Sequence, residues 1–388
     1  MLHYRIKITD YIYNQEEIIM LTTNINSFPE DITIEILSRL PAKFVLRFRC
    51  VCKSWLELTK KPSFISKHFQ NNSTKTRLFV DAFVTSTVVG EGIVTSALYL
   101  FHDEKLANLS YEDIKPQIHD KFVGYHDGLC CIMQSSTNRL TIWNPATREF
   151  RNLPNYKYCN SSNSVIFYST FIGLESDPIN NDFKLLFVHN LWNEKRKRYG
   201  KVPNVQVYTF RTNSWRELYD HQLDRYFVLG EGQFGRFTYL KKVCYWLVIS
   251  DTRDLKVILS FHMDNEVFEE IKIPPQVNYD TSISLYKDSL SIVIPDAENC
   301  FEIWVMNDSK CWAKNFTLGP FFNLNLPTNH GFWKNDAFFL ESDIRTDNGR
   351  HFLRCLLLYD HSAKEIKDLQ LTEPRDVFIY KESLMTIQ

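Results

Sequence analysis

The sequence lacks the residue patterns on which most enzymes and metalloproteins depend. No G-x-S-x-G, H-E-x-x-H or Walker-type lysine sequence occurs in its 388 residues, so the motifs that usually carry hydrolase or nucleotide-binding residues are missing. The 11 histidines are dispersed, with no pair at i and i+4. We therefore expect a chain that is not an enzyme and that holds no metal and no cofactor.

Long apolar runs are also missing. No segment reaches the about 18 to 20 apolar residues of a membrane span, and residues 1–23 lack the continuous apolar stretch of a signal peptide. We expect no membrane partner, and a protein that works in the cytoplasm with the nucleus as a second compartment. The first nineteen residues fit neither module described below, so we expect Met20 to be the working start.

Cysteine is present, but not in a pattern that binds zinc or forms a disulfide framework. The count of nine is odd, and no C-x-x-C pair occurs. Scattered thiols of this kind are typical of a reducing compartment. Cys130 and Cys131 are adjacent on a predicted strand, so their side chains point to opposite faces and cannot serve one site. We expect both to be core thiols.

Neither sign of charge dominates the whole chain. The formal net charge of −1 and the pI of about 6.8 give no reason to expect nucleic acid as a partner. Residues 28–77 hold ten Lys/Arg against four Asp/Glu, about +6, and residues 78–388 are correspondingly acidic at about −6. Arg47, Arg49 and Lys53 lie in the basic region without a recognition-helix motif. We interpret them as a solvated helix face or a face that meets an acidic partner.

A short helical module is predicted near the start of the chain. The sequence S-F-P-E at 27–30 is a capping box, which begins a helix. Ile32, Ile36 and Leu40 follow at a spacing of four and form an apolar stripe, which ends at Pro41 because proline lacks the helical amide. The apolar pattern continues through three further short helices. A unit of about forty residues that is this apolar needs a partner surface.

The stretch FPEDITIEILSRLPAKFVLRFRCVCKSWLEL resembles the F-box, with its paired prolines, its L-R-F-R-C-V-C-K-S-W core and its terminal tryptophan. The resemblance implies a helical interface with a Skp-family adaptor and, through it, a cullin; at standard size this interface would bury on the order of 1,600 Å². By motif position it implies nine adaptor contacts: Phe28, Pro29, Ile36, Leu40, Pro41, Leu46, Val51, Cys52 and Trp55. Phe28 stands where the motif usually has Leu. An alternative is that Val51 and Trp55 only hold the helices together.

The rest of the chain repeats a strand-turn-strand phrase six times. In five copies an aromatic residue is followed seven residues later by an apolar residue and three later by another. These triplets are Tyr99/Leu106/Leu109, Trp143/Phe150/Leu153, Tyr208/Trp215/Leu218, Phe261/Phe268/Ile271 and Tyr359/Ile366/Leu369. The sixth copy, Trp304/Trp312/Phe316, slips by one residue at each step. Each phrase has alternating apolar residues around a turn rich in Asp, Asn, Thr and Ser, which predicts a hairpin.

A single hairpin cannot bury its apolar face, so the repeats predict sheets stacked around a ring. We expect a β-propeller of about six blades over residues 78–388, after a helical F-box domain at 25–70 and a disordered extension at 1–24. Further strands are predicted at 128–132, 183–188, 243–249 and 289–294, and the tail 377–387 is free to close the ring. A β-sandwich built from the same strands is the alternative fold.

The strings WNPATREFRNLP, NSWREL, EIWVM and YKESLMTI resemble the F-box-associated domain of plant F-box proteins, especially the S-locus F-box group. The resemblance implies the substrate-recognition subunit of an SCF-type ubiquitin ligase, and more narrowly a pollen protein that recognises pistil ribonucleases of non-self type. A receptor for an unrelated plant protein is the first alternative, and a propeller-fold enzyme is the second. The residues that bind the target are unknown; candidate loops are 154–180, 190–203 and 219–236.

Residues 229–235, L-G-E-G-Q-F-G, spell the glycine-rich phosphate loop of a protein kinase. A kinase also needs downstream H-R-D and D-F-G sequences to hold its base and magnesium, and neither occurs. A dinucleotide-binding loop would be followed by a helix, whereas the sequence after residue 235 is strand-like. We interpret the segment as a loop that leads into a strand.

Overall fold

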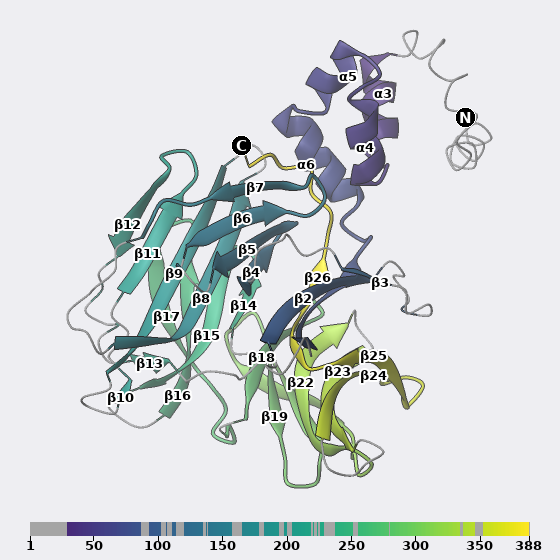
Figure 1. Cartoon of the computed structure of the whole chain (residues 1–388). Coiled ribbons are helices and arrows are strands. Elements are labelled where there is room, and N and C mark those ends of the chain that lie inside the picture. The colour runs from purple at the N-terminus through teal and green to yellow at the C-terminus, as the bar shows by residue number, and fades with distance from the viewer. Residues whose placement is uncertain are drawn as a thin grey trace.

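A group of short helices precedes a ring of β-sheets in the computed structural model (Figure 1). The helices of the described residues are α3 (Glu30–Leu37), α4 (Ala42–Phe48), α5 (Lys53–Leu58) and α6 (Pro62–Asn71). The structure describes residues 29–86, 93–101, 106, 111–113, 120–134, 137, 139–156, 165–177, 182–193, 198–199, 204–218, 220, 223, 226–228, 237–250, 255–278, 280–333, 337–345 and 352–387. The predicted extension at 1–24 and residues 27 and 28 of the predicted capping box lie outside these residues. A capping box would place Glu30 in the third helical position, whereas α3 begins at Glu30 and is preceded by Pro29 without a side-chain cap, so that prediction is wrong.

Prolines set the beginnings of three of these helices. Pro29 and Pro41 each precede a helix, with φ of −54° and −56°, and Pro62 occupies the first turn of α6. A fixed φ near −65° and the absence of an N–H suit proline to these positions, where the amide would have no helical partner. The first helix ends at Leu37, and residues 38–40 form the turn that leads to Pro41. We define residues 29–71 as the head.

The strands form six antiparallel sheets, so the propeller prediction is confirmed and the sandwich alternative is wrong. Blade 1 consists of β26 (Pro374–Tyr380), β1 (Arg77–Ser86), β2 (Ile93–Phe101) and β3 (Tyr111–Asp113). Blade 2 consists of β4 (Asp120–His126), β5 (Leu129–Gln134), β6 (Leu140–Asn144) and β7 (Glu149–Asn152). Blade 5 consists of β18 (Ser282–Tyr286), β19 (Ser289–Pro295), β20 (Phe301–Met306) and β21 (Trp312–Leu318). Blade 6 consists of β22 (Asn325–Trp333), β23 (Ala337–Arg345), β24 (Phe352–Asp360) and β25 (Glu365–Thr372).

Two blades have an additional short strand. Blade 3 consists of β8 (Val165–Asp177), β9 (Asp182–Asn193), β10 (Arg198–Tyr199), β11 (Asn204–Thr209) and β12 (Ser214–Leu218). Blade 4 consists of β13 (Tyr226–Val228), β14 (Phe237–Leu240), β15 (Val243–Ser250), β16 (Leu255–His262) and β17 (Val267–Lys272). In blade 4, β13 and β14 pair in succession with the same strand, β15. The kinase-like stretch at 229–235 lies between them, outside the described residues.

The predicted repeat corresponds to cross-strand pairs. In four copies the aromatic residue and the apolar residue seven positions later are direct partners: Trp143 with Phe150, Tyr208 with Trp215, Phe261 with Phe268, and Tyr359 with Ile366. Each pair is separated by a short turn whose last residue has a left-handed φ, as Arg148 and Lys364 do at 61° and 58°. A constant turn length therefore gives the constant spacing in the sequence.

The other two copies differ for identifiable reasons. The slipped copy has one extra turn residue, because Met306 pairs with Trp312 across residues 307–311, and its ladder shifts between Ile303 and Trp304. In the first copy Leu106 is not the cross-strand partner of Tyr99, which pairs instead with Asp113 of β3. Leu106 is buried but belongs to no strand, and Leu109 lies outside the described residues.

The chain closes the ring with its last strand. β26 pairs with β1 from Arg77 and Tyr380 onward, so the first blade contains strands from both ends of the propeller. The predicted closing tail began at 377; the observed strand begins at Pro374 and ends at Tyr380. Residues 381–387 continue beyond it without strand pairing. We call residues 381–387 the tail segment.

The antiparallel order gives the ring two different ends. The strand ends at Arg77 and Tyr380 and the turns at 127–128 and 145–148 lie on the side of the head, which we call the junction end. The connections at 296–300 and 319–324 lie at the opposite end, which we call the free end. Each follows a strand, β19 or β21, whose other end begins at a turn on the junction side. All three predicted loop candidates contain strand residues: β8 occupies 165–177, the end of β9 and the whole of β10 occupy 190–193 and 198–199, and β13 occupies 226–228.

Candidate adaptor-binding head and its junction with the propeller

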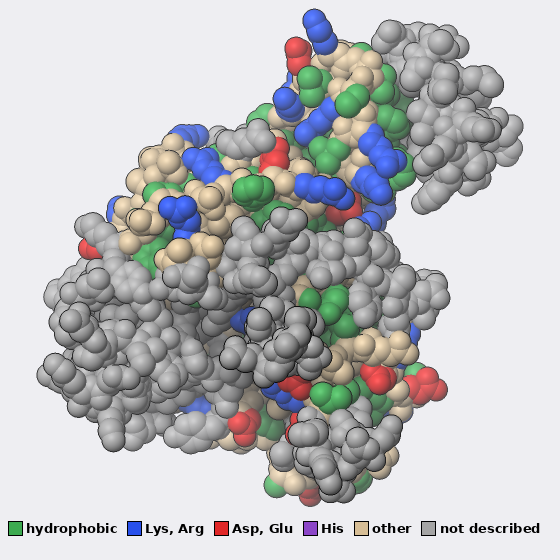
Figure 2. All heavy atoms as spheres, in the orientation of Figure 1, with side chains coloured by type: hydrophobic (Ala, Val, Ile, Leu, Met, Phe, Trp, Pro, Cys, Tyr) green, Lys and Arg blue, Asp and Glu red, His purple; other side chains and the backbone are tan. Residues whose placement is uncertain are grey.

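The head exposes large apolar side chains. Ile32 of α3 is 46% exposed, and Val51, which follows α4, is 38% exposed. Figure 2 shows hydrophobic side chains interspersed with Lys and Arg on the helices. An apolar surface of this kind on so small a unit has the character of an interaction face.

Most of the predicted adaptor contacts reach the surface of the head. Six of the nine are exposed or half-buried: Pro29, Ile36, Pro41, Leu46, Val51 and Cys52. Phe28 lies outside the described residues. The contact of these side chains with an adaptor stays a prediction, because their accessibility is necessary for it but does not demonstrate it.

Leu40 and Trp55 are buried inside the head, at 8% and 9% exposure. The Trp55 ring meets the Phe48 ring edge-on, with 5.6 Å between their centroids. Both residues therefore help to hold the helices together, which is one part of the alternative interpretation of Trp55, and their contact with an adaptor stays a prediction. The same alternative fits Val51 less well, since that side chain is exposed.

Charged side chains form a small network on the outside of the head. The Glu35 carboxylate lies 2.8 Å from Lys67 Nζ and also accepts hydrogen bonds from Arg39. The hydrogen bonds from Lys67 and Arg39 lower the pKa of Glu35 to about 2. Because these groups are solvated, the network contributes little to stability.

Arg49 lies partly inside the head, unlike the other basic residues predicted to form a solvated face. Its Nε donates to Thr59 Oγ1 at 3.2 Å, and burial lowers its pKa while the Glu149 carboxylate of blade 2 opposes this shift. Arg47 and Lys53 are exposed, as predicted. The electrostatic partner of Arg49 is thus on the propeller.

His68 of α6 is fully buried, and its Nε2 lies 2.8 Å from the backbone oxygen of Leu40. A carbonyl can only accept, so Nε2 carries the proton, and Nδ1 has no hydrogen-bond partner. Burial lowers the pKa of His68, so the ring is neutral. Nothing in the local sequence distinguishes this histidine, and sequence analysis missed it.

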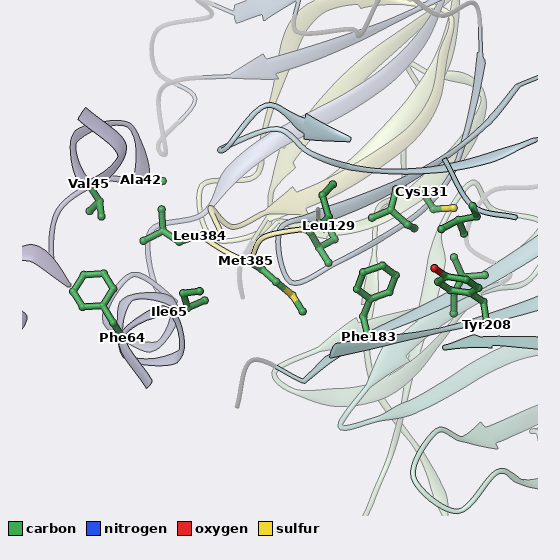
Figure 3. Close-up of a cluster of buried hydrophobic side chains, with 14 of the residues drawn as sticks. Ala42, Val45, Phe64, Ile65, Leu129, Cys131, Phe183, Tyr208, Leu384 and Met385 are labelled. Carbon is green, nitrogen blue, oxygen red and sulfur yellow. The ribbon is translucent and has the colours of Figure 1, made fainter. Parts of the chain in front are cut away.

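One continuous apolar core joins the head, the propeller and the tail segment (Figure 3). Ala42, Val45, Phe64 and Ile65 enter it from the helices. The blade residues in this core include Leu129, Cys131, Phe183 and Tyr208, and the tail segment supplies Leu384, Met385 and Ile387. Every one of these side chains is at most 2% exposed, so the head is packed onto the ring rather than tethered to it.

Among the residues that the structure describes, no group of three or more His, Cys, Asp or Glu could hold a metal ion. None of the described helices is long and apolar enough to cross a membrane. Cys130 and Cys131 lie in different apolar clusters, as predicted for opposite faces of a strand. Burial raises the pKa of both thiols, which disfavours the reactive thiolate.

Comparisons with known families agree with this architecture. The family model described as F-box domain matches residues 25–67, and the model described as F-box associated beta propeller domain matches residues 95–382. The chain is an F-box protein of the F-box-associated propeller family. F-box proteins are in general non-catalytic, and an F-box followed by a propeller is in general the arrangement of a substrate-recognition adaptor in an SCF ubiquitin ligase.

Relatives of this F-box protein are found in Arabidopsis thaliana. It is 28% identical to the putative F-box protein At3g16210 over 63% of this chain and 60% of that one. It is 26% identical to the putative F-box protein At3g17500 over 82% of this chain and 80% of that one. The first match therefore spans less than two thirds of the relative. A chain in a nidogen/laminin crystal structure has a TM-score of 0.46 at 10% identity, covering 78% of this chain and 98% of that one, too distant to add to the fold described above.

Proposed function

We propose that this F-box protein is the substrate-recognition subunit of an SCF-type ubiquitin ligase. The head would bind a Skp-family adaptor and, through it, a cullin. The exposed side chains of Ile32 and Val51 carry this proposal, because they are the large apolar side chains that stay exposed on the described residues of an otherwise packed head.

The protein would perform no bond chemistry itself. Its contribution is geometric: a target held at one place on the ligase presents its lysines to a charged ubiquitin-conjugating enzyme at high effective concentration. The packed junction between the head and the ring supports this role, since a rigid connection preserves the distance between adaptor and target.

The free end of the ring is the proposed target surface. It faces away from the head, and its connections at 296–300 and 319–324 are longer than the turns at 127–128 and 145–148 of the junction end. Phe322 in the connection at 319–324 is 74% exposed, which supports a protein contact there. The charge of about −6 on residues 78–388 favours a basic target through electrostatic steering.

A narrower proposal names the target as a pistil ribonuclease of non-self type. It is supported by the resemblance of four sequence strings to the S-locus F-box group, and not by the names of the relatives above. Free cysteines throughout the described residues support the cytoplasm, with the nucleus as a second compartment, as the place of action.

Binding of a purified Skp-family adaptor to the full chain tests the proposal. We expect Ile32→Glu combined with Val51→Glu to abolish binding without unfolding the chain, because a charge would be desolvated in the interface. Phe322→Glu, at the free end, is the matched control and should bind like the original chain. An original chain that does not bind the adaptor, or a double variant that binds it equally well, would refute the proposal.

A further inference from the structure

The tail segment is buried although it belongs to no sheet. Ser383, Leu384, Met385 and Ile387 are each at most 4% exposed. A segment that pairs with no strand and forms no helix is normally mobile, because ordering its backbone costs entropy. Extensive contacts must therefore stabilise this one.

Polar contacts hold the tail segment to blade 2. The Asn144 side-chain amide donates to the backbone oxygens of Ser383 and Met385 at 3.0 and 2.8 Å. The Lys381 amide donates to the Tyr125 hydroxyl at 2.7 Å, and the Ile387 amide donates to a Glu149 carboxylate oxygen at 3.1 Å. Backbone groups that a strand partner would satisfy are satisfied here by side chains.

Glu382 connects the tail segment to both sides of the junction. One carboxylate oxygen accepts from the Ala42 amide at 2.9 Å, where α4 begins in the head. The other lies 2.8 Å from the Arg77 guanidinium, where the first propeller strand begins. A single side chain thus joins the head, the first blade and the end of the chain.

Apolar contacts complete the attachment. In Figure 3, Leu384 lies beside Ala42 and Ile65 of the head, and Met385 lies between the head and the blade residues around Phe183. The tail segment is therefore interposed between the two modules, so that neither can move relative to the other without exposing its side chains.

Gly128 shows how closely the tail segment is fitted. It has a left-handed φ of 84°, and a Cβ placed on it would lie 2.4 Å from Ser383 Cβ and 2.8 Å from the Lys381 oxygen. Any side chain at this turn would push the segment out of its position.

We propose that the tail segment is a brace that fixes the orientation of the F-box head on the propeller. The chain between α6 and β1 is only a few residues long, yet a short link alone leaves rotation about its bonds free. The brace adds a second, distant point of attachment. Its use in the ligase rests on the function proposed above: a fixed head keeps target lysines at a constant position relative to the conjugating enzyme.

Asn144→Asp gives a selective test of the brace. The substitution keeps the oxygen that accepts from the Ala146 and Thr147 amides of its own turn, and replaces the donor that binds the tail segment by a second acceptor. Asn307→Asp is the matched control, because Asn307 accepts from its own turn at Ser309 and Cys311 in blade 5, away from the tail segment. Both variants replace an asparagine by an aspartate, but only Asn144→Asp removes a contact with the tail segment.

Amide hydrogen exchange of the full chain, measured alone and again with the Skp-family adaptor, is the measurement. We expect peptides covering 381–388 and the start of α4 to exchange about tenfold faster in Asn144→Asp, with Asn307→Asp like the original chain. Gly128→Ala should give the same result from the opposite side of the contact, and it serves as the second variant if Asn144→Asp does not fold. Unchanged exchange in both regions in a folded variant would overturn the brace.

A reconstituted ligase provides a second readout, in which lysines of the propeller itself accept ubiquitin. We expect a narrow set of ubiquitinated lysines on the original propeller and a broader set in Asn144→Asp, because a loosened head samples more orientations. The same narrow set in both would overturn the role of the brace in ubiquitin transfer. Lack of adaptor binding by the original chain would instead refute the proposed function, and the exchange result would remain a separate test of the brace.

Discussion

The carboxylate of Asp81 lies 3.5 Å from the guanidinium of Arg375, so an ion pair joins the first and the last strand of the ring. Asp81 is 2% exposed and stands on β1, next to a shift in the ladder with β26. The pair therefore reinforces the ladder where the two ends of the propeller meet.

Replacement of Arg375 by methionine should destabilise the propeller strongly. The buried Asp81 carboxylate would lose the positive charge of Arg375, a change that costs about 3 kcal/mol. Urea denaturation of the full chain measures it, with Arg139→Met, an exposed arginine of blade 2, as the control expected to be neutral. A midpoint equal to that of the original chain would show that the ladder alone closes the ring.

Protonation of His68 should weaken the fold as the pH falls below about 6.5. The folded-state pKa is below the unfolded value, so the unfolded state binds more protons between the two pKa values and stability decreases as pH falls through that range. His68→Gln keeps a donor for the Leu40 oxygen and cannot be protonated. Thermal unfolding between pH 7.5 and about 5.5 should show a smaller decrease for this variant than for the original chain or for His361→Gln.

Phe64→Ala should create a cavity in the core that joins the head to the ring. Phe64 is 2% exposed, and removing a buried aromatic ring costs about 3 to 5 kcal/mol. We expect a lower unfolding midpoint and weaker adaptor binding together, because the head loses its support. Phe150→Ala, at a 61% exposed position, should change neither quantity greatly. Equal effects of the two substitutions would contradict the packed junction.

Gly173→Ala should disturb the contact between blades 3 and 4. A Cβ at Gly173 would lie 2.2 Å from Cys244 Sγ, a buried atom that cannot move aside freely. Overpacking of this kind costs about 1 to 3 kcal/mol. The paired variant Gly173→Ala with Cys244→Ala should recover much of the loss, and failure to do so would show that the two sites do not interact.

The repeat in the sequence predicts the propeller because hairpin turns of constant length place partners such as Trp143 and Phe150 at a constant spacing. The same rule fails for Tyr99, whose returning strand begins only at Tyr111. Apolar spacing does not encode the length of a longer connection, and Leu106 satisfied the spacing without being in a strand. Local pattern therefore predicts tight hairpins well and long ones poorly.

The head could be located from its motif, but its packing could not. Trp55 and Val51 are both apolar in the sequence, and the structure buries Trp55 on α5 and exposes Val51 in the turn between α4 and α5. The contact of His68 with Leu40 spans 28 residues, and that of Asn144 with Met385 spans 241. Such contacts depend on the meeting of distant segments, for which the sequence offers no periodic signal.

The same limit applies to the end of the chain. The string YKESLMTI was expected to belong to the closing strand, since its apolar residues suit a buried segment. Burial is observed for Leu384 and Met385, but their surroundings are the head and blades 2 and 3 rather than a strand partner. Apolar residues predict burial, and only the assembled fold determines what covers them.

Purification of the tagged full chain from its native tissue under proteasome inhibition, with mapping of ubiquitin remnants, tests the central claim most directly. The account predicts that a Skp-family adaptor and a cullin accompany the original chain and not the Ile32→Glu, Val51→Glu variant. It also predicts that some target proteins are recovered with both the original chain and the variant, and that these proteins carry ubiquitin only when recovered with the original chain. Recovery of the original chain without adaptor and cullin, or bound proteins with equal ubiquitination in both forms, would contradict it.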